Sequence, residues 1–248
     1  MRQHSDTTHC TPGRKPVAEL LHTNPQGIDT VFIEDAPGLG DIITACRAHG
    51  VRFRKLPRKE MDRIFPGNHQ GVVARLRFRH MTDLEELIER TVQAPFPLII
   101  ALDQVQDPGN VGTLARTLHA LGGAGLLFPQ DRTAFLGTGA SKAAAGALDH
   151  LGLCQVVNLA RALDACAQAG FALYGTGMGE GCTPLFTARI HRPAVLVLGN
   201  EDKGMRPNVA KRCETVLTIP MCGGFDSINV AQAGAMIMTE MLRQWQLT

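Results

Sequence analysis

The sequence predicts an α/β protein whose larger, C-terminal part holds a mostly parallel sheet. Nearly continuous apolar runs are typical of strands buried on both faces of such a sheet. Four such runs occur in this part, at 98–102, 125–128, 195–198 and 216–219. Helix-like stretches separate or follow them, at 111–121, 159–169 and 229–246. Strands that alternate with helices favour a parallel arrangement.

The first third of the chain predicts a smaller module. Residues 1–14 are polar and have no apolar period, so we expect a flexible lead-in. From 15 to 79, short helices and strands follow one another, with helices near 17–21 and 39–49 and strands near 30–34, 51–54 and 71–78. Thr82 or Asp83 then begins an acidic helix that ends near Pro95. The predicted parts are therefore a lead-in (1–14), a small α/β domain (15–79), a linker helix (80–95) and the main domain (96–248).

The composition narrows the class of protein. With 248 residues, 44% of them apolar and 19% charged, the chain can bury a sizeable core. No apolar run approaches the roughly 18 residues of a membrane span, and the N-terminal residues lack the apolar segment of a secretory signal. We expect a cytoplasmic protein. The seven cysteines include no C-x-x-C pair, so we expect no metal site.

Positive charge gathers in the small module. Residues 1–80 carry 13 Lys/Arg and 8 Asp/Glu, whereas residues 81–248 carry 12 and 15. A basic cluster lies within a dozen positions: Arg52, Arg54, Lys55, Arg58, Lys59 and Arg63. It is either a solvated face or a surface that binds phosphates.

Three polar segments in the second half each begin where a predicted strand ends. They are Asp107-Pro-Gly-Asn-Val-Gly with Arg116, Leu198-Gly-Asn-Glu-Asp-Lys-Gly204, and Ile219-Pro-Met-Cys-Gly-Gly-Phe-Asp-Ser-Ile-Asn-Val230. The carboxyl ends of parallel strands meet at one edge of a sheet, where ligands bind. We therefore expect one pocket built from all three segments.

Each polar residue in these segments has a structural interpretation and a functional one. Asn110 is placed to cap the helix 111–121, and Ser227 or Asn229 to cap the last helix. Glu201 follows a buried strand, and a carboxylate at that depth needs donors. Arg116 lies on a helix that must largely face a core, so its guanidinium needs a partner, and its planar fork suits a phosphate.

Familiar catalytic motifs are incomplete here. Gly199–Gly204 has the spacing of a phosphate loop, but Met205-Arg206 replaces the Lys-Ser/Thr pair. Gly175-Thr-Gly-Met-Gly-Glu-Gly lacks the third glycine of a dinucleotide motif. Gly139–Ala143 resembles a nucleophile elbow except at its last residue. ATPase, hydrolase and dinucleotide-dependent enzyme are weak interpretations.

The three segments, in this order and spacing, resemble the three signature motifs of the SpoU/TrmH family of RNA ribose 2′-O-methyltransferases, over roughly residues 98–246. In the small module, Gly13-Arg-Lys-Pro-Val-Ala-Glu-Leu-Leu and Asn68-His-Gln-Gly-Val-Val-Ala resemble the RNA-binding domain of the RlmB-like branch. Gln130-Asp-Arg-Thr-Ala and Ala140-Ser-Lys-Ala-Ala-Ala-Gly-Ala are similar to the same branch. That branch modifies a guanosine of large-subunit (23S) ribosomal RNA.

The resemblance implies an α/β trefoil-knot (SPOUT) methyltransferase domain after a small α/β RNA-binding domain. S-adenosyl-L-methionine would bind in the knotted loops and give its methyl group to a ribose 2′-hydroxyl of structured RNA. The implied catalytic residues are Asn110, Arg116, Glu201, Ser227 and Asn229. The implied cofactor-binding residues are Leu198, Gly199, Asn200, Gly204, Ile219, Met221, Ile228 and Asn229. The basic cluster would bind RNA.

The resemblance also implies a homodimer packed through the C-terminal helix, which includes Met236, Ile237, Met238, Met241 and Leu242. The chain departs from the family pattern at Asp202, Ile228 and Ala231-Gln232, which bears on substrate choice and cofactor affinity. Alternatives stay open: the same chemistry on transfer RNA or another ribosomal site, a non-catalytic RNA-binding relative, or a small-molecule α/β enzyme.

Overall fold

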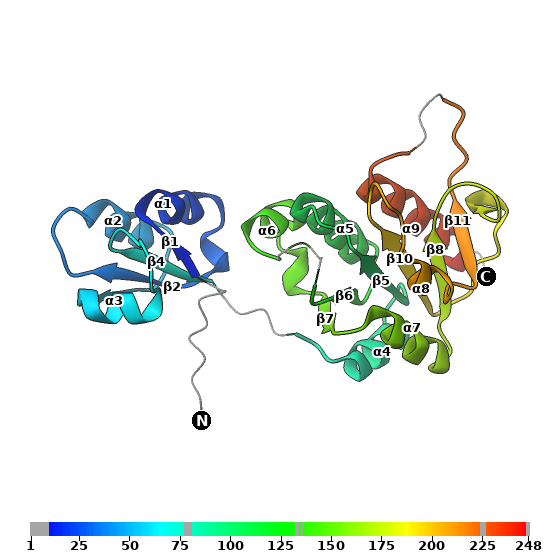
Figure 1. The fold of residues 1–248 in the computed structure, drawn as a ribbon, viewed down its shortest axis with the longest axis horizontal. Coiled ribbons are helices and arrows are strands. Elements are labelled where there is room, and N and C mark those ends of the chain that lie inside the picture. Colours follow the sequence, from blue (N-terminus) through cyan, green and yellow to red (C-terminus); the bar gives the residue numbers. More distant parts are fainter. Residues whose placement is uncertain (1–9, 77–80, 132–133, 135, 224–226, 247–248) are drawn as a thin grey trace. The chain divides into compact units, whose positions relative to one another are not determined.

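The computed structural model describes residues 10–76, 81–131, 134, 136–223 and 227–246 (Figure 1). The chain divides into two compact units, with the boundary between residues 79 and 80. Among the described residues, no helix combines the length and the apolar character that crossing a bilayer requires.

Over residues 10–76, the smaller unit is a four-stranded sheet with three α-helices and one turn of 3-10 helix. The strands are β1 (Cys10–Pro12), β2 (Ile28–Glu34), β3 (Phe53–Leu56) and β4 (Val72–Leu76), in the order β1-β4-β2-β3. The helices are α1 (Arg14–Thr23), η2 (Pro25–Gly27), α2 (Gly40–Ala48) and α3 (Arg58–Ile64). Only the β2–β3 pair is parallel. Val17, Ile33 and Cys46 lie at the centre of the core of this unit, fully shielded from solvent.

Two parts of the smaller unit differ from the sequence prediction. Cys10–Pro12, expected in the flexible lead-in, pair with β4 as the edge strand β1. A strand this short has no apolar period by which it could be recognised. Helix α3 was not predicted either, because it buries only Met61 and is otherwise charged and exposed.

The larger unit is built on a seven-stranded, entirely parallel sheet with the order β7-β6-β5-β10-β8-β11-β9. Its strands are β5 (Leu98–Asp103), β6 (Gly125–Pro129), β7 (Gly152–Val156), β8 (Ala172–Thr176), β9 (Thr183–Pro184), β10 (Ala194–Gly199) and β11 (Thr215–Thr218). Its helices are α4 (Leu84–Val92), α5 (Pro108–Ala120), α6 (Thr138–Ala144), η3 (Ala147–Asp149), α7 (Leu159–Gln168), η4 (Leu185–Thr187), α8 (Pro207–Ala210) and α9 (Val230–Gln246). The four strands expected from their apolar runs are confirmed. β7, β8 and β9 were not predicted.

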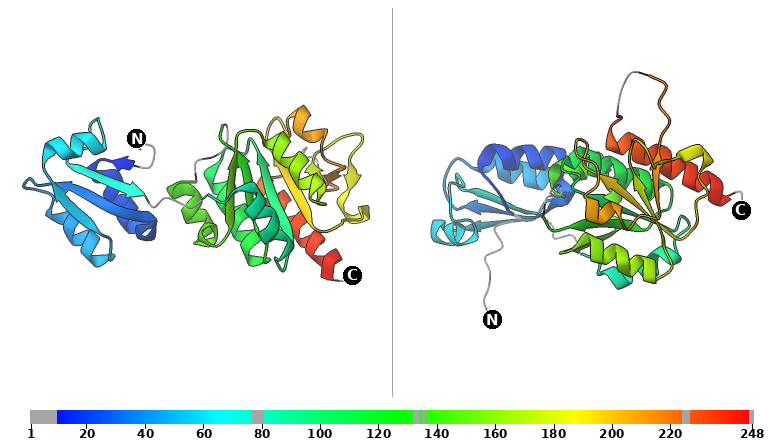
Figure 2. Two further views of the ribbon diagram at one scale, coloured as in Figure 1. Left: turned by 90° about the horizontal axis from the view of Figure 1, so that it is seen from below. Right: turned by 45° about the vertical axis from the view of Figure 1, so that its right-hand side comes forward.

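Helices cover both faces of this sheet, α5 and α9 on one side and α4 and α7 on the other (Figures 1 and 2). Side chains alternate along each strand, so Leu98, Ile100 and Leu102 pack toward α5 and α9. Ile99 and Ala101 pack toward α4 and α7. Each fully buried leucine or isoleucine contributes about 1.5–3 kcal/mol relative to an exposed one. This two-sided burial explains why β5 is a continuous apolar run.

The segment 80–95, expected as a linker helix, packs onto the larger unit. Asp83 caps α4, since its carboxylate accepts a hydrogen bond from the Glu86 N–H at 2.8 Å. Leu87 is fully buried beneath the sheet. The Thr82 N–H donates to the Leu153 carbonyl oxygen at 2.9 Å. An amphipathic helix with a fully buried leucine therefore belongs with the core that it covers.

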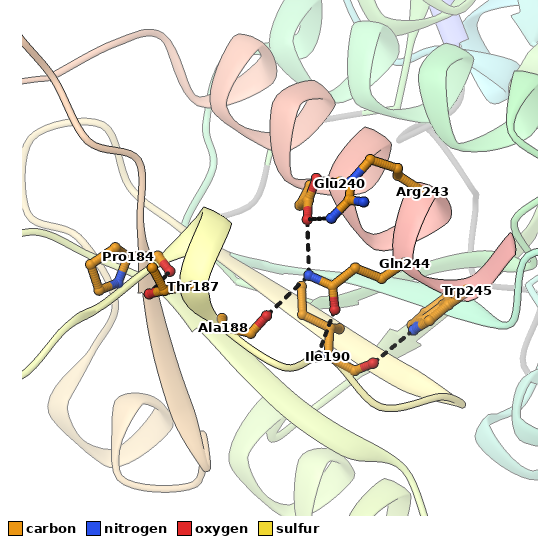
Figure 3. A network of polar contacts seen from close by, with 8 residues as sticks. All are labelled: Pro184, Thr187, Ala188, Ile190, Glu240, Arg243, Gln244 and Trp245. Carbon is orange, nitrogen blue, oxygen red and sulfur yellow. Dashed lines mark hydrogen bonds and ion pairs between the residues drawn. The ribbon is translucent and has the colours of Figure 1, made fainter. Parts of the chain in front are cut away.

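The C-terminal half of α9 is joined to the segment 184–192 by a polar network (Figure 3). The Gln244 amide donates to the Ala188 carbonyl oxygen at 3.0 Å and accepts from the Ile190 N–H at 3.1 Å. The Trp245 indole N–H donates to the Ile190 carbonyl oxygen at 3.1 Å. Glu240 receives hydrogen bonds from Arg243 at 2.7 Å and from Gln244 at 2.9 Å.

Most apolar side chains of α9 are buried within its own unit. Ile237, Met238 and Met241 are at most 1% exposed and belong to the core above β5 and β10. Met236 alone among the expected dimer residues is well exposed, at 50%. The chain's own sheet therefore covers Ile237, Met238 and Met241, and the homodimer implied by the resemblance stays a prediction.

Candidate functional site

Three segments that are distant in sequence meet at the carboxyl ends of β5, β10 and β11. The Asn110 side-chain amide donates to a Glu201 carboxylate oxygen at 2.7 Å. The Asn229 side-chain amide donates to the Asn110 side-chain oxygen at 2.9 Å. Residues separated by 91 and 119 positions are thus joined in one chain of hydrogen bonds. The predicted convergence of the three segments is observed.

Helix α5 begins three residues earlier than the sequence predicts, which frees the Asn110 side chain. Asp107 is the cap, and its carboxylate accepts from the Asn110 N–H at 2.7 Å. Pro108 takes the first helical position, where a missing N–H costs nothing. The expectation that Asn110 caps this helix is wrong. Its amide lies in the first turn and binds Glu201 and Asn229 instead.

Asn229 performs the capping expected of it and also contacts the site. Its side-chain oxygen accepts from the Ala231 N–H at 2.8 Å and the Gln232 N–H at 3.3 Å, at the start of α9. Its amide nitrogen is thereby turned toward Asn110. The Asn229 side chain therefore both caps α9 and takes part in the hydrogen bonds that join Glu201, Asn110 and Asn229.

The segment after β10 is a closed turn. Asn200 and Gly204 exchange backbone hydrogen bonds of 3.1 and 2.9 Å. The Asn200 side-chain oxygen accepts from the N–H groups of Asp202 and Lys203, both at 3.1 Å. A Cβ atom on Gly199 would come within 2.4 Å of the Gly204 backbone. Only glycine at position 199 lets the turn fold back this closely.

A cavity of about 190 Å³ opens beside this turn. Leu217, Ile219, Ile228, Val230 and Ile237 give it an apolar wall. Its remaining lining residues are Thr176, Gly177, Met178, Gly199, Asn200, Glu201, Asp202, Gly204, Thr218, Met221, Ser227 and Ala233. Within the part of the chain that the structure describes, two of the lining side chains are carboxylates and none is a lysine, arginine or histidine.

Most residues expected to bind a cofactor line this cavity. Gly199, Asn200, Gly204, Ile219, Met221 and Ile228 do so, as do the expected catalytic residues Glu201 and Ser227. Leu198 does not: it is fully buried in β10 and packs in the core. Asn229 lies beside the lining residues and contacts Asn110.

Arg116 and Glu201 are both exposed, which corrects two sequence expectations. Arg116 does not face the core, and within the described part of the chain no hydrogen bond or ion pair holds it. It follows Asn110 by six residues in α5, about 9 Å along the axis at the usual helical rise. The structure therefore leaves this guanidinium available to a molecule from outside. Glu201, expected at depth, has its donor in Asn110 at the surface.

The sequence prediction missed Thr176, Gly177 and Met178, which line the cavity next to the end of β8. They belong to the glycine-rich segment that was set aside because it lacks a dinucleotide motif. The available signal was its position directly after a buried strand, the same signal that identified the other three segments.

Two further features near the site concern a buried cysteine and potential metal ligands. Burial raises the pKa of Cys213, which lies behind Gly175, to about 12, so its thiol stays protonated. Among the described residues, no group of three or more His, Cys, Asp or Glu side chains is placed to hold a metal ion. The site offers amides, carboxylates and backbone groups, which bind and orient.

The basic cluster of the smaller unit gathers on β3 and α3. Arg52, Arg54, Lys55, Arg58, Lys59 and Arg63 are all exposed. Lys55 forms an ion pair with Asp35 at 3.3 Å, and Arg58 one with Glu34 at 3.8 Å. Exposed pairs of this kind contribute at most about 1 kcal/mol. The cations therefore remain free to exchange these partners for others.

The chain matches two protein families along most of its length. Residues 97–239 match the SpoU rRNA Methylase family, and residues 12–81 match the family described as RNA 2′-O ribose methyltransferase substrate binding. The chain is 39% identical to the 23S rRNA (guanosine-2′-O-)-methyltransferase RlmB of Pseudomonas aeruginosa, over 94% of this chain and 95% of the relative. It is 35% identical to an uncharacterised tRNA/rRNA methyltransferase of Synechocystis, of which it spans only 53%.

The fold is shared with solved structures. An AdoMet-bound rRNA methyltransferase from Sinorhizobium meliloti superposes with a TM-score of 0.63 at 24% identity, over 98% of this chain and 90% of that one. In this chain, the seven-stranded sheet of the larger unit and the cavity beside the turn after β10 lie within residues 97–239, the segment that matches the SpoU family. The chain therefore belongs to the SpoU rRNA Methylase family of S-adenosylmethionine-dependent RNA 2′-O-methyltransferases.

Proposed function

We propose that this chain transfers a methyl group from S-adenosyl-L-methionine to the ribose 2′-hydroxyl of a guanosine in 23S ribosomal RNA. The Pseudomonas aeruginosa relative, matched over nearly the whole of both chains, carries that activity in its name. The observation that carries the proposal is the chain of hydrogen bonds from Glu201 through Asn110 to Asn229, at the edge of a cavity lined by the same three segments.

The cavity residues fit S-adenosylmethionine, which supplies a methyl group on a positively charged sulfur. The apolar wall, with Leu217, Ile219 and Ile228, suits the adenine ring. The backbone of the tight turn 199–204 can bind the polar edge of the base and the ribose hydroxyls. Among the described residues, Glu201 and Asp202 are the charged residues of the lining, and their negative charge favours a cationic ligand. An anionic dinucleotide would meet repulsion here.

We assign the reaction to groups that position and stabilise. An arginine guanidinium is not deprotonated in proteins, so it serves poorly as a base. The exposed guanidinium of Arg116 suits an RNA phosphate and the negative charge that develops on the ribose oxygen. Asn110, Glu201 and Asn229 set the shape of the site through their mutual hydrogen bonds, and Ser227 contributes a hydroxyl on the cavity wall.

Two further features of the family are part of the proposal. We infer that the segments 199–204 and 219–229 belong to a trefoil knot. Their packing around one cavity, with β10 between β5 and β8, supports this. We also infer a homodimer whose contact surface includes Met236 and Phe186. These side chains are 50% and 65% exposed, on α9 and on η4 beside it.

The smaller unit supplies RNA affinity in this proposal. Its six exposed cations, of which Arg52 directly precedes β3 and the others lie on β3 and α3, form a surface suited to phosphates. It matches the substrate-binding family over residues 12–81. Binding through phosphates alone does not select a nucleotide, so the choice of target rests on RNA shape and on the site of the larger unit.

The proposal is tested by replacing Arg116 with alanine. Arg116→Ala should keep its affinity for RNA within about threefold yet lose methyl transfer by about 10²-fold or more, since one transition-state contact is removed. Arg161→Ala, which removes another exposed arginine of the same unit from α7, is the matched control and should leave both unchanged. RNA binding is measured by filter retention and transfer by labelled methyl groups. Full methylation by Arg116→Ala would refute the assigned role.

A further inference from the structure

The chain segments that lead to Asn110 and away from Glu201 are joined a second time, by a contact between Asp103 and Arg206. Asp103, the last residue of β5, is completely buried. One of its carboxylate oxygens accepts from the Arg206 backbone N–H at 2.7 Å, and the other accepts from Arg206 Nε at 2.7 Å. Neither residue lines the cavity. The cavity alone therefore gives no reason for this buried ion pair.

The Asp103–Arg206 pair joins the end of β5 to the segment that follows β10. Asp103 lies opposite Gly199 in the β5–β10 register, where the two strands end together. Asn110 follows Asp103 by seven residues, and Glu201 precedes Arg206 by five. A further tie runs in parallel, because the Asn200 side-chain amide donates to the Gln104 carbonyl oxygen at 3.1 Å. The hydrogen bonds that join the turn 199–206 to the end of β5 therefore determine the position of Glu201.

The two hydrogen bonds to Asp103 fix both the backbone and the side chain of Arg206. A carboxylate that accepts charge-assisted hydrogen bonds on both oxygens restricts both the distance and the direction of its donor. Asp103 is buried, so losing these donors would leave a desolvated charge, which is strongly unfavourable. The turn after β10 is therefore held in one conformation, with Glu201 within reach of Asn110.

We propose that Asp103 and Arg206 are positioning residues for methyl transfer, which hold the turn 199–206 so that Glu201 meets Asn110 and the cavity keeps its shape. The kinetic consequence rests on the function proposed above. The structural consequence, an ordered Asn110–Glu201 hydrogen bond, does not depend on that function.

The test compares Arg206→Gln, Arg206→Lys and a matched control, Arg212→Gln. Arg212 also forms an ion pair with an aspartate of the same unit, away from the cavity lining: its Nε and one terminal guanidinium nitrogen donate to Asp164 at 2.8 and 3.0 Å. Three quantities are measured on the full chain. They are the side-chain amide NMR signal of Asn110, the Kd for S-adenosylmethionine by calorimetry, and kcat with KM for RNA. Thermal unfolding establishes that each variant is folded.

Arg206→Gln should shift or broaden the Asn110 amide signal, weaken cofactor binding and lower kcat by about 10²-fold, as a small misplacement of catalytic groups does. KM for RNA should stay unchanged, since Arg206 is assigned no RNA contact. Arg206→Lys keeps the charge and the backbone N–H but loses the Nε donor to Asp103, so we expect a smaller loss in the same quantities. Arg212→Gln should lower the unfolding temperature only.

A folded Arg206→Gln protein with an unchanged amide signal, cofactor Kd and kcat would overturn the positioning role. If Arg206→Gln does not fold, Arg206→Lys decides the matter, and wild-type values in all three quantities would overturn it. A wild-type protein that transfers no methyl group would refute the proposed function instead. The Asn110 amide signal would then still test the position of the turn.

Discussion

At the scale of single residues, Asn229 has two separable tasks. Its side-chain oxygen caps α9 and its amide nitrogen donates to Asn110. Asparagine can do both because it carries an acceptor and a donor on one group. A residue that keeps the acceptor and loses the donor should therefore separate stability from activity.

Asn229→Asp is that change. Aspartate is an equally good cap, so the unfolding temperature should stay within a few degrees of wild type. The donor to Asn110 is lost and a third carboxylate enters the site, so methyl transfer should fall about tenfold or more. Asn229→Ala loses the cap as well, so its free energy of unfolding should fall by about a further 0.5–2 kcal/mol. Wild-type transfer rates in Asn229→Asp would show that the amide contact has no part in the reaction.

Residue types at strand ends could be predicted from the sequence, whereas their partners could not. Asn110, Glu201 and Asn229 stood out because each follows an apolar run, but their mutual hydrogen bonds depend on tertiary distances. The cap of α5 was misplaced by three residues, because Asp107 and Asn110 are both good caps and only the fold selects one. Arg116 was expected on a helix that largely faces a core, but helix periodicity alone does not say that this side chain lies on the exposed side of α5.

At the scale of elements, the close packing of α5 against α6 depends on Gly112. A Cβ atom there would lie 2.3 Å from the Ala140 carbonyl oxygen and 2.6 Å from the Ala143 Cβ atom. Alanine is the better helix former by about 1 kcal/mol in an unhindered position. We expect the clash to outweigh this gain, because backbone atoms cannot move aside as a flexible side chain can.

Gly112→Ala should therefore lower the free energy of unfolding by about 1–3 kcal/mol, the usual range for overpacking. Chemical denaturation measures it. Thr113→Ala, the adjacent exposed position on the same helix, should change stability by no more than about 0.5 kcal/mol. A Gly112→Ala protein as stable as wild type would mean that α6 shifts freely against α5.

The end of α9 gives a stability contribution that depends on pH. Hydrogen bonds from Arg243 hold the pKa of Glu240 at about 2, well below its usual 4.5. Its folded-state pKa is lowered, so the contribution is present above about pH 4.5 and disappears as the pH falls toward 2. Glu240→Gln should be less stable than wild type by about 1 kcal/mol at pH 7, as expected for a partly exposed pair.

The difference between Glu240→Gln and wild type should shrink as the pH is lowered from 5 toward 3. Urea denaturation at a series of pH values measures this. A difference that stays constant over that range would show that the hydrogen bonds from Arg243 do not lower the pKa of Glu240.

Central elements were easier to predict than peripheral ones. β5, β6 and β10 are apolar runs because helices bury them on both faces. β9 has two residues and β1 three, too few for any periodic signal. α3 is amphipathic over barely two turns, with a single buried methionine. Such elements are stabilised by the rest of the fold rather than by their own pattern.

At the scale of the whole molecule, the two units should contribute separately to binding. Replacing Arg52, Arg54, Lys59 and Arg63 with glutamine removes four exposed cations of the smaller unit. The affinity for RNA should fall and its dependence on salt should become less steep, because fewer counterions are released. The Kd for S-adenosylmethionine should not change, since the cavity lies wholly in the larger unit.

Fluorescence titration at several salt concentrations, with calorimetry for the cofactor, measures both effects. An unchanged salt slope would mean that the basic cluster is only a solvated face. The exposed Met236 gives a second test at this scale: Met236→Glu should convert a dimer to a monomer in light scattering. A wild-type protein that is monomeric at micromolar concentration would contradict the proposed dimer.

The central claim is that the three strand-end segments form one site for methyl transfer to a ribose hydroxyl. The most direct measurement incubates the protein with methyl-labelled S-adenosylmethionine and large-subunit ribosomal RNA that lacks ribose methylation, then digests the RNA to nucleosides. The label should appear in 2′-O-methylguanosine and should be absent from the same RNA exposed to Arg116→Ala. Label on a base, or no label in any nucleoside, would contradict the proposed reaction.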